Sequence, residues 1–447
     1  MTAAVSRPSE HALLGLGALS FQAFLLAQFL SLTRLFWSTR LGEAASSLAS
    51  LAGLLSVGLL APAVLAYGLR AGSLFGTLAP AARGWVAMVL SLSWFLFFYG
   101  WLAKGNVVTA AAHDLTPYLV LLASAVLGSI PRVWQDSDRF IVFLFAAALV
   151  INAAGMTEMT RVVTESYAED RAGVGIVAYR TQGALAFWPL LFLTARQRRV
   201  RVALLAFAGV CFVLAQQILF QKRAPTFRIA LFVLAFLFVL PRLRRRPGVR
   251  APSEGGVRAR FLATAAVALA VALAISPWLF HGQVAGLFDR ISGQRYSGGA
   301  AGMLTWENER FFEAGMFFRT LEPQELLLGR GFGGYFVPDA PGWGVWLDDV
   351  HEFGRRQLHV GGLMPFFKGG LALSLAYYLG LALALFRGAR SLTEPFAAAA
   401  FLVVLLHALF LLQEGFFIMS LSFDLVMVGL CMGHLLSRQR TLQGARP

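Results

Sequence analysis

Residues 82–102 read Ala82-Arg-Gly-Trp-Val-Ala-Met-Val-Leu-Ser-Leu-Ser-Trp-Phe-Leu-Phe-Phe-Tyr-Gly-Trp-Leu102. A segment needs about 20 mostly apolar residues to cross the hydrocarbon core of a bilayer as a helix. No water in that core can satisfy the backbone N–H and C=O groups, and a helix satisfies them internally. The stretch therefore predicts a membrane-spanning helix.

Runs of the same kind recur along the chain. They lie at about 12–33, 47–69, 82–102, 115–131, 139–156, 173–195, 201–220, 226–241, 260–280, 359–386, 396–413 and 416–436. We therefore expect an all-α fold, a polytopic transmembrane helical bundle of about 12 spans. The first run is expected to be a retained helix, because Ser31-Leu-Thr-Arg34 is not a small-x-small cleavage site and further spans follow at once.

Composition supports the membrane class. Of the 447 residues, 58% are hydrophobic and 14% charged, and the mean hydropathy is +0.67. Soluble domains have roughly 45–50% apolar and 25% charged residues. The formal charge of +15 could suggest nucleic acid, but the basic residues are divided between opposite sides of the membrane, so we expect anionic lipid and no nucleic acid as partner. Cys211 and Cys431 both fall in apolar runs, which gives no disulfide framework.

The distribution of Lys and Arg predicts the orientation. Cationic loops resist translocation and stay in the cytoplasm. One alternate set of connections is rich in arginine, including Arg70, Arg83, Arg132, Arg139, the run Arg196-Gln-Arg-Arg-Val-Arg201, Arg242 to Arg246, Arg387, Arg390, Arg438 and Arg440. We therefore place both termini in the cytoplasm and the loop at 281–358 outside.

Three regions follow from this topology. Residues 1–280 hold spans one to nine, 281–358 form a long external loop, and 359–447 hold spans ten to twelve and a cytoplasmic tail. Long loops are uncommon and are often functional. Within this one, residues 305–319 have apolar side chains at helical spacing, with Arg310 and Glu313 on a polar side, and Leu321-Glu-Pro323 ends the expected amphipathic helix.

Two loop motifs have alternative interpretations. Gly329-Arg-Gly-Phe-Gly-Gly334 lacks the Lys-Ser/Thr of a P-loop, so it is either a tight turn that needs positive φ or a close backbone approach to an anion. Asp348-Asp349-Val-His351-Glu352 could hold a divalent metal. Adjacent residues of an extended segment point in opposite directions, so we favour a solvated acidic loop and expect no metal or cofactor.

External arginines form the main candidate site. Arg161 lies between the fifth and sixth spans, while Arg180 and Arg228 lie within or at the edge of the hydrocarbon zone. A guanidinium there is costly unless it is paired or faces a polar cavity, and its rigid fork of donors suits phosphate oxygens. The alternative is snorkelling to external headgroups. His359, where the loop re-enters the membrane, is either a base for a sugar hydroxyl or an ordinary interfacial histidine.

The order of these features from about 175 to 385 resembles the O-antigen ligase and O-antigen polymerase family of bacterial envelope glycosyltransferases. The segment Ile218-Leu-Phe-Gln-Lys-Arg223-Ala-Pro-Thr-Phe looks like its Arg-containing start of a span. Glu309-Arg310 and Leu327-Leu-Gly-Arg-Gly-Phe-Gly-Gly-Tyr335 look like its Arg and Gly-x-Gly loop elements. His359 through Phe367-Lys-Gly-Gly-Leu371 looks like its His-containing span entry, with Val360 in place of the usual Asn.

The resemblance implies a metal-independent glycosyltransferase of the bacterial inner membrane. It implies transfer of glycan from an undecaprenyl pyrophosphate carrier to an acceptor sugar hydroxyl on the periplasmic face, in O-antigen or exopolysaccharide assembly. His359 would be the general base, and Arg310 would be a catalytic residue that helps to hold the pyrophosphate. The donor would be held by the substrate-binding residues Arg180, Arg223, Arg161, Arg319 and Trp306. Partners would be the lipid-linked donor, a glycan or lipopolysaccharide acceptor, membrane lipids, a flippase and a chain-length regulator.

Other functions fit the same sequence. An O-antigen ligase differs from a polymerase only in its acceptor, the lipopolysaccharide core, and we favour the polymerase. A secondary transporter or flippase also fits twelve spans and buried arginines, but it predicts Pro/Gly breaks near the middle of spans and charges near the bilayer centre. A membrane scaffold would need neither His359 nor the arginines. Sugar, linkage, acceptor and chain length depend on pocket shape, which the sequence does not give, and neither does it give the oligomeric state.

Overall fold

The structure is a computed structural model that describes the two ends of the chain. The described residues are 8–32, 55–70, 75–144, 309–338, 345–347, 349–350, 352–358, 360–392, 394–411 and 423–437, with a few single positions between 44 and 52 and between 146 and 150. The fold described below is that of these residues.

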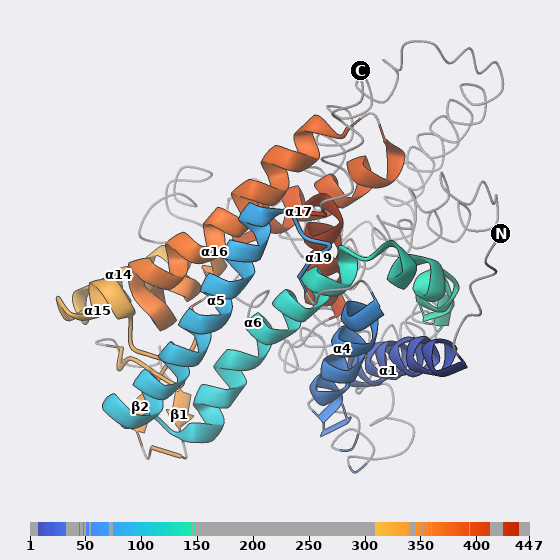
Figure 1. The fold of residues 1–447 in the computed structure, drawn as a ribbon. Coiled ribbons are helices and arrows are strands. Elements are labelled where there is room, and N and C mark those ends of the chain that lie inside the picture. Colours follow the sequence, from blue (N-terminus) through green and yellow to red (C-terminus); the bar gives the residue numbers. More distant parts are fainter. Residues whose placement is uncertain are drawn as a thin grey trace, which may run out of the picture.

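The described chain is mainly helical (Figure 1). Its elements are α1 (Pro8–Leu32), η1 (Ser56–Leu59), α4 (Leu60–Arg70), α5 (Pro80–Phe98), the π-helical turn η2 (Tyr99–Ala103), α6 (Val108–Gly128), α14 (Glu309–Arg319), α15 (Glu325–Leu328), β1 (Val345–Leu347), β2 (Glu352–Gly354), η4 (Gly361–Leu363), α16 (Met364–Arg390), α17 (Pro395–Leu411) and α19 (Phe423–Leu435). Residues 131–144 are also helical.

Four helices are long and apolar enough to cross a membrane. They cover Leu13–Leu30, Pro80–Ala103, Val108–Gly128 and Gly361–Arg390. Shorter apolar helices lie at Ser56–Arg70, Phe396–Leu409 and Leu425–Leu435. The helical fold is therefore confirmed for the described residues, whose four long apolar helices support the membrane class, while the full set of about 12 spans stays a prediction.

Small residues let α6 and α19 pack closely. A Cβ added to Gly433 of α19 would lie 1.8 Å from the carbonyl oxygen of Ala125, and one on Gly429 would lie 2.6 Å from Cβ of Ser124. On α6, a Cβ added to Gly128 would lie 2.1 Å from the carbonyl oxygen of Leu430. Small residues four apart are the means by which membrane helices approach without large side chains between them.

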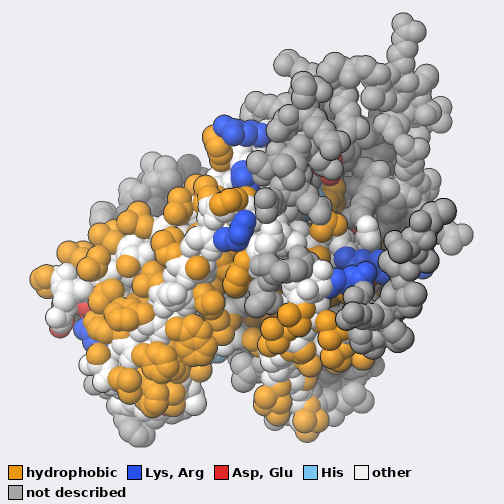
Figure 2. All heavy atoms as spheres, in the orientation of Figure 1, with side chains coloured by type: hydrophobic (Ala, Val, Ile, Leu, Met, Phe, Trp, Pro, Cys, Tyr) orange, Lys and Arg blue, Asp and Glu red, His pale blue; other side chains and the backbone are white. Residues whose placement is uncertain are grey.

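Helices α5 and α16 run side by side (Figure 1). The indole N–H of Trp85 donates to the carbonyl of Ala376 at 2.9 Å, and the same ring fills the space over Gly380. Buried tryptophan needs a partner for its N–H, and this bond supplies one. The outer faces of α5 and α16 are apolar, as Figure 2 shows, and their exposed residues include Trp94, Phe98, Leu375 and Phe386.

Different segments of the chain meet at the two ends of this bundle. At one end the start of α5 meets the end of α19, since the Ala79 N–H donates to the Leu436 carbonyl at 3.0 Å. Arg387 of α16 donates to the same carbonyl at 3.3 Å. At the other end, the end of α5 and the starts of α6 and α16 meet the loop elements (Figure 1). The residues at the first end, including Arg83, are among those that the charge bias assigns to the cytoplasm.

The helix α6 begins earlier than the apolar run from which its span was predicted. The expected span at 115–131 is the helix α6, Val108–Gly128, which begins seven residues earlier than expected. His113 and Asp114 interrupt the apolar run near its beginning, so the unbroken apolar stretch starts only after them. Asp114 is nevertheless only 3% exposed, because a lysine of α16 pairs with it. The pairing partner, absent from any local window, explains the error.

The loop helix forms where it was expected. Helix α14 covers Glu309–Arg319, inside the expected 305–319. Glu313 was placed on a polar side, and this was wrong. Its side chain is fully buried and pairs with Arg355, and Phe317 beside it is buried among other rings. The helix therefore packs on the protein rather than lying free on the surface.

Candidate functional site

The Gly329–Gly334 segment is a tight turn docked onto the membrane helices. Gly329, Gly331 and Gly333 have φ of 63°, 73° and 80°, a conformation that side chains with a Cβ rarely adopt. A Cβ on Gly331 would lie 2.6 Å from Cα of Gly100 in η2. One on Gly329 would lie 2.6 Å from the backbone nitrogens of Gly369 and Gly370 in α16. The expected tight turn is confirmed, and what approaches its backbone so closely is the protein's own chain.

Helix α16 is interrupted where the turn meets it. Gly369 (φ −138°, ψ 16°) and Gly370 (φ 58°, ψ −155°) are non-helical and separate a first turn, Met364–Lys368, from the rest of the helix. The carbonyl of Phe367 accepts a hydrogen bond of 3.0 Å from the backbone N–H of Arg330. The first turn of α16 is thus bonded to the glycine-rich turn.

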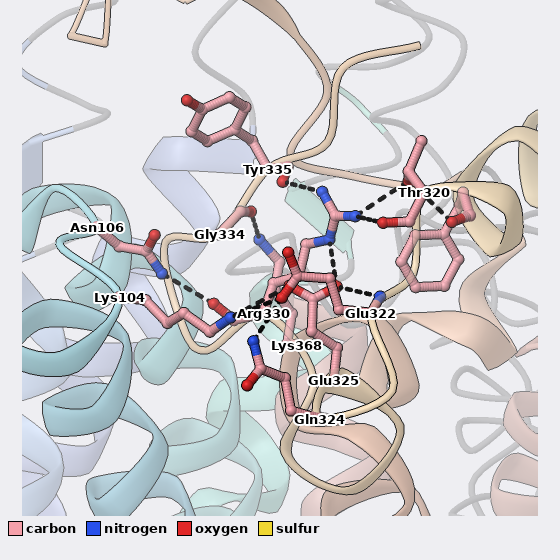
Figure 3. A network of polar contacts seen from close by, with 11 residues as sticks. Lys104, Asn106, Thr320, Glu322, Gln324, Glu325, Arg330, Gly334, Tyr335 and Lys368 are labelled. Carbon is pink, nitrogen blue, oxygen red and sulfur yellow. Dashed lines mark hydrogen bonds and ion pairs between the residues drawn. The ribbon is translucent and has the colours of Figure 1, made fainter. Parts of the chain in front are cut away.

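The side chain of Arg330 ties the turn together internally (Figure 3). Its guanidinium donates to the carbonyls of Tyr335 at 2.7 Å and Thr320 at 2.6 Å. Its Nε also lies 3.3 Å from the carboxylate of Glu325, which pairs with Lys104 at 3.4 Å. Arg330 therefore joins Thr320, which precedes α15, to Tyr335, which follows it, and we call these contacts the Arg330 clamp.

Asp114 and Lys368 form a buried ion pair beneath the turn. Lys368 Nζ lies 2.7 Å from Asp114 Oδ2, and the two side chains are 1% and 4% accessible. Lys368 also donates to the carbonyl of Gly334 at 2.7 Å (Figure 3), while the Gly333 N–H donates to Asp114 Oδ2 at 2.7 Å. A buried ion pair is tolerated only with such further hydrogen bonds. The anion that the glycine-rich turn holds is a carboxylate of the protein itself.

Asn106 completes the docking from the link between η2 and α6. Its side-chain amide donates to the carbonyls of Arg330 at 3.0 Å and Phe332 at 2.9 Å. The Phe332 ring stacks on Tyr118 of α6 with a centroid separation of 5.4 Å. The turn is thus held by polar contacts at its backbone and by a buried ring at its centre.

Two neighbouring arginines, Arg355 and Arg356, follow the end of β2. Arg355 pairs with the buried Glu313 of α14 and exchanges two backbone hydrogen bonds, 2.9 and 2.8 Å, with Phe336. Arg356 pairs with Asp349 at 2.7 Å, and its charge interacts with that of Lys368. Arg356 Nε is buried and has no hydrogen-bond acceptor in the described part of the chain. Such an unfilled donor is costly in a folded protein.

The expected site residues are only partly visible. Arg319 is the last residue of α14 and is exposed. Arg310 belongs to the first turn of α14, but its side chain lies outside the description. The remaining expected residues lie outside the described residues, namely His359, Arg161, Arg180, Arg223 and Trp306. The structure therefore brings the helix of Arg310 to the docked turn and leaves the other assignments as predictions.

The acidic segment at 348–352 has one described side chain. Asp349 forms an ion pair with Arg356 at 2.7 Å. Asp348, His351 and the side chain of Glu352 lie outside the description. Among the residues that are described, no group of three His, Cys, Asp or Glu side chains could hold a metal ion.

Sequence reasoning missed the residues that organise this site. Asp114 and Lys368 both lie inside helices of membrane-spanning length and composition. An ionisable residue in such a helix is a functional candidate by default, and this signal was available. Lys104, Glu325 and Arg356 carried no comparable signal, because charged residues are ordinary in loops.

Comparison with known proteins adds no relative. No family model, no curated protein and no solved structure matches the chain.

Proposed function

We propose that this protein is a membrane glycosyltransferase, a polymerase that transfers glycan from an undecaprenyl pyrophosphate carrier to an acceptor sugar hydroxyl. The reaction would take place at the periplasmic face of the bacterial inner membrane, in O-antigen or exopolysaccharide assembly. The observation that carries the proposal is the docking of the long loop, through its glycine-rich turn, onto one end of α5, α6 and α16.

The docked loop supports the proposal because it offers a rigid scaffold beside the membrane. Catalysis with a pyrophosphate leaving group depends chiefly on positioning and on neutralising charge. Helix α14, which carries Arg310, packs through Phe317 against Phe336 and Phe367, with ring centroids 5.8 and 5.0 Å apart. Arg310 would thus be presented from a fixed helix at the membrane surface.

Arg356 joins the proposed set of phosphate-binding residues. Its Nε has no acceptor in the described chain, and a pyrophosphate oxygen would repay that cost. Arg330 is excluded from this role, since its guanidinium is bonded to Tyr335, Thr320 and Glu325.

The distribution of charge supports the proposed orientation. Arg83, Arg387 and Arg390 lie towards the end of the bundle opposite to the docked loop. Positive residues stay on the cytoplasmic side, so the loop would lie in the periplasm with both termini inside.

A deletion strain tests the reaction. It is complemented with the native chain, Arg356→Ala, Arg310→Ala or His359→Ala, and envelope glycans are compared at equal chain abundance. Arg132→Ala is the matched control, because Arg132 is exposed and pairs within its own helix with Asp136. We expect single repeat units in the deletion strain, no restoration by the three site variants, and full restoration by the control. Unattached long chains would instead identify an O-antigen ligase, and unchanged glycans in the deletion strain would exclude both.

A transporter or flippase is the second candidate. The observation in its favour is the interruption of α16 at Gly369 and Gly370 beside the buried Asp114–Lys368 pair, since broken helices and buried charges line transport sites. The break lies near the N-terminal end of α16 rather than near its middle, where a transport site would be expected. This position favours the enzyme. Accumulation of complete lipid-linked units on the cytoplasmic face of the deletion strain would identify the flippase.

A further inference from the structure

We infer that Asp114 and Lys368 are positioning residues, whose buried pair fixes the glycine-rich turn and helix α14 in the place that the transfer reaction requires. The inference rests on the proposed function for its second half. Its first half, the fixing of the loop, is a statement about the structure alone and is tested separately below.

The pair joins three segments that are far apart in the sequence. Asp114 belongs to α6, Lys368 to the first turn of α16, and Gly333 and Gly334 to the turn between them. Each charged group contacts both the other and the turn: Lys368 donates to the Gly334 carbonyl, and Asp114 accepts from the Gly333 N–H, both at 2.7 Å. Losing either charge therefore removes one of the bonds that hold the turn and leaves the other charge buried without its partner.

Helix α14 depends on the same contact. The N–H of Arg330 donates to Phe367, the residue before Lys368, and the Phe367 ring packs edge-on against Phe317 of α14. The break at Gly369–Gly370 uncouples this first turn of α16 from the rest of the helix. The place of this first turn of α16 is consequently set by its contacts with the glycine-rich turn and by the Lys368 ammonium, and not by continuation of the helix.

Stability alone does not account for the pair. Buried ion pairs replaced by apolar groups of similar volume are often neutral or stabilising, whereas removal of one partner is strongly destabilising. The double variant Asp114→Asn/Lys368→Met removes both charges and keeps the approximate volumes. It separates a stabilising role from a positioning role, because only positioning predicts a folded chain with a displaced loop.

The experiment uses the full chain purified in detergent and returned to proteoliposomes. Melting temperature reports folding, the rate of tryptic cleavage between 319 and 356 reports loop position, and kcat and KM with a lipid-linked oligosaccharide donor report the reaction. The matched control is Arg132→Met/Asp136→Asn, which removes an opposite-charge pair elsewhere on the described helices, with side chains 59% and 21% accessible, and leaves an amide oxygen at 136 to accept from the Tyr67 hydroxyl.

We expect the double variant to melt near the native temperature, to be cleaved in the loop faster, and to lose kcat by about tenfold or more with the donor KM little changed, because small misplacements cost rate. The control should match the native chain in all three. If the double variant does not fold, Asp114→Glu replaces it, because it keeps the charge for Lys368 but displaces the carboxylate from the Gly333 N–H, and the same faster cleavage is expected.

Native protection of the loop in a folded, charge-free variant would overturn the inference, whatever the activity. Faster cleavage with native kcat would also overturn it, because position would then not matter for the reaction. Faster cleavage in a protein whose native form transfers no glycan would refute the proposed function and leave the fixing of the loop established.

Discussion

Gly433 of α19 lies so close to Ala125 of α6 that a Cβ added to the glycine would stand 1.8 Å from the alanine carbonyl oxygen. The contact lies near the C-terminal ends of both helices, which form the pair in most extensive contact among the described elements. It makes the absence of a side chain at 433 a condition for this packing.

Gly433→Ala should therefore destabilise the bundle. Overpacking a tight contact costs about 1–3 kcal/mol, enough to lower the melting temperature of the purified protein. Gly15→Ala on α1 is the control, because nothing lies within 4 Å of its added Cβ. Both changes gain the same helix propensity, so equal melting temperatures for the two variants would show that α6 and α19 are not packed in this way.

Gly331→Ala should displace the glycine-rich turn. Its φ of 73° is matched by Gly105 at 70°, but a Cβ at 331 meets Gly100 at 2.6 Å, whereas one at 105 meets nothing within 4 Å. Backbone strain alone costs roughly 1–2 kcal/mol at both positions. Faster tryptic cleavage of the loop in Gly331→Ala than in Gly105→Ala measures the extra clash, and identical cleavage would contradict the docking.

Glu325→Gln should loosen the Arg330 clamp. The carboxylate is buried and pairs with Lys104 and Arg330, and hydrogen bonds to charged groups contribute about 1.5–3 kcal/mol. Glu322→Gln is the control, since that side chain is 58% accessible and lies 3.9 Å from Lys104. Exposed pairs contribute about 0–1 kcal/mol. A lower melting temperature for Glu322→Gln than for Glu325→Gln would therefore contradict this account.

Trp85→Phe should weaken the contact between α5 and α16. The change removes the 2.9 Å hydrogen bond to the Ala376 carbonyl and part of the ring over Gly380, at a cost of about 1–3 kcal/mol. Trp94→Phe changes the same residue type on the same helix, where the side chain is 42% exposed. Thermal unfolding of the two variants in detergent compares the sites, and a larger loss at 94 would contradict the interhelical bond.

Much of the helical frame could be predicted from the sequence. The apolar stretch at 82–102 matches the observed Pro80–Ala103, and 359–386 matches Gly361–Arg390, because burial in a bilayer needs only length and apolar composition. The turn at Gly329–Gly334 was predictable for a similar reason, since glycine alone favours repeated positive φ.

The candidate site was predictable only in outline. The loop and the helix of Arg310 were found from local pattern, while the roles of Arg161, Arg180, Arg223, Arg319, Trp306 and His359 remain predictions from charge placement, residue chemistry and resemblance. Glu313 was misread, because amphipathic spacing cannot tell a solvated carboxylate from one buried against a distant arginine.

The sequence by itself determined which segments are apolar helices and where the backbone turns, since both follow from properties of neighbouring residues. Only the tertiary structure decided which charges meet. Asp114 and Lys368 are separated by most of the chain, and each alone would be too costly to bury. Their pairing under the glycine-rich turn removes that cost, and it is a property of the packed helices that no local stretch of sequence contains.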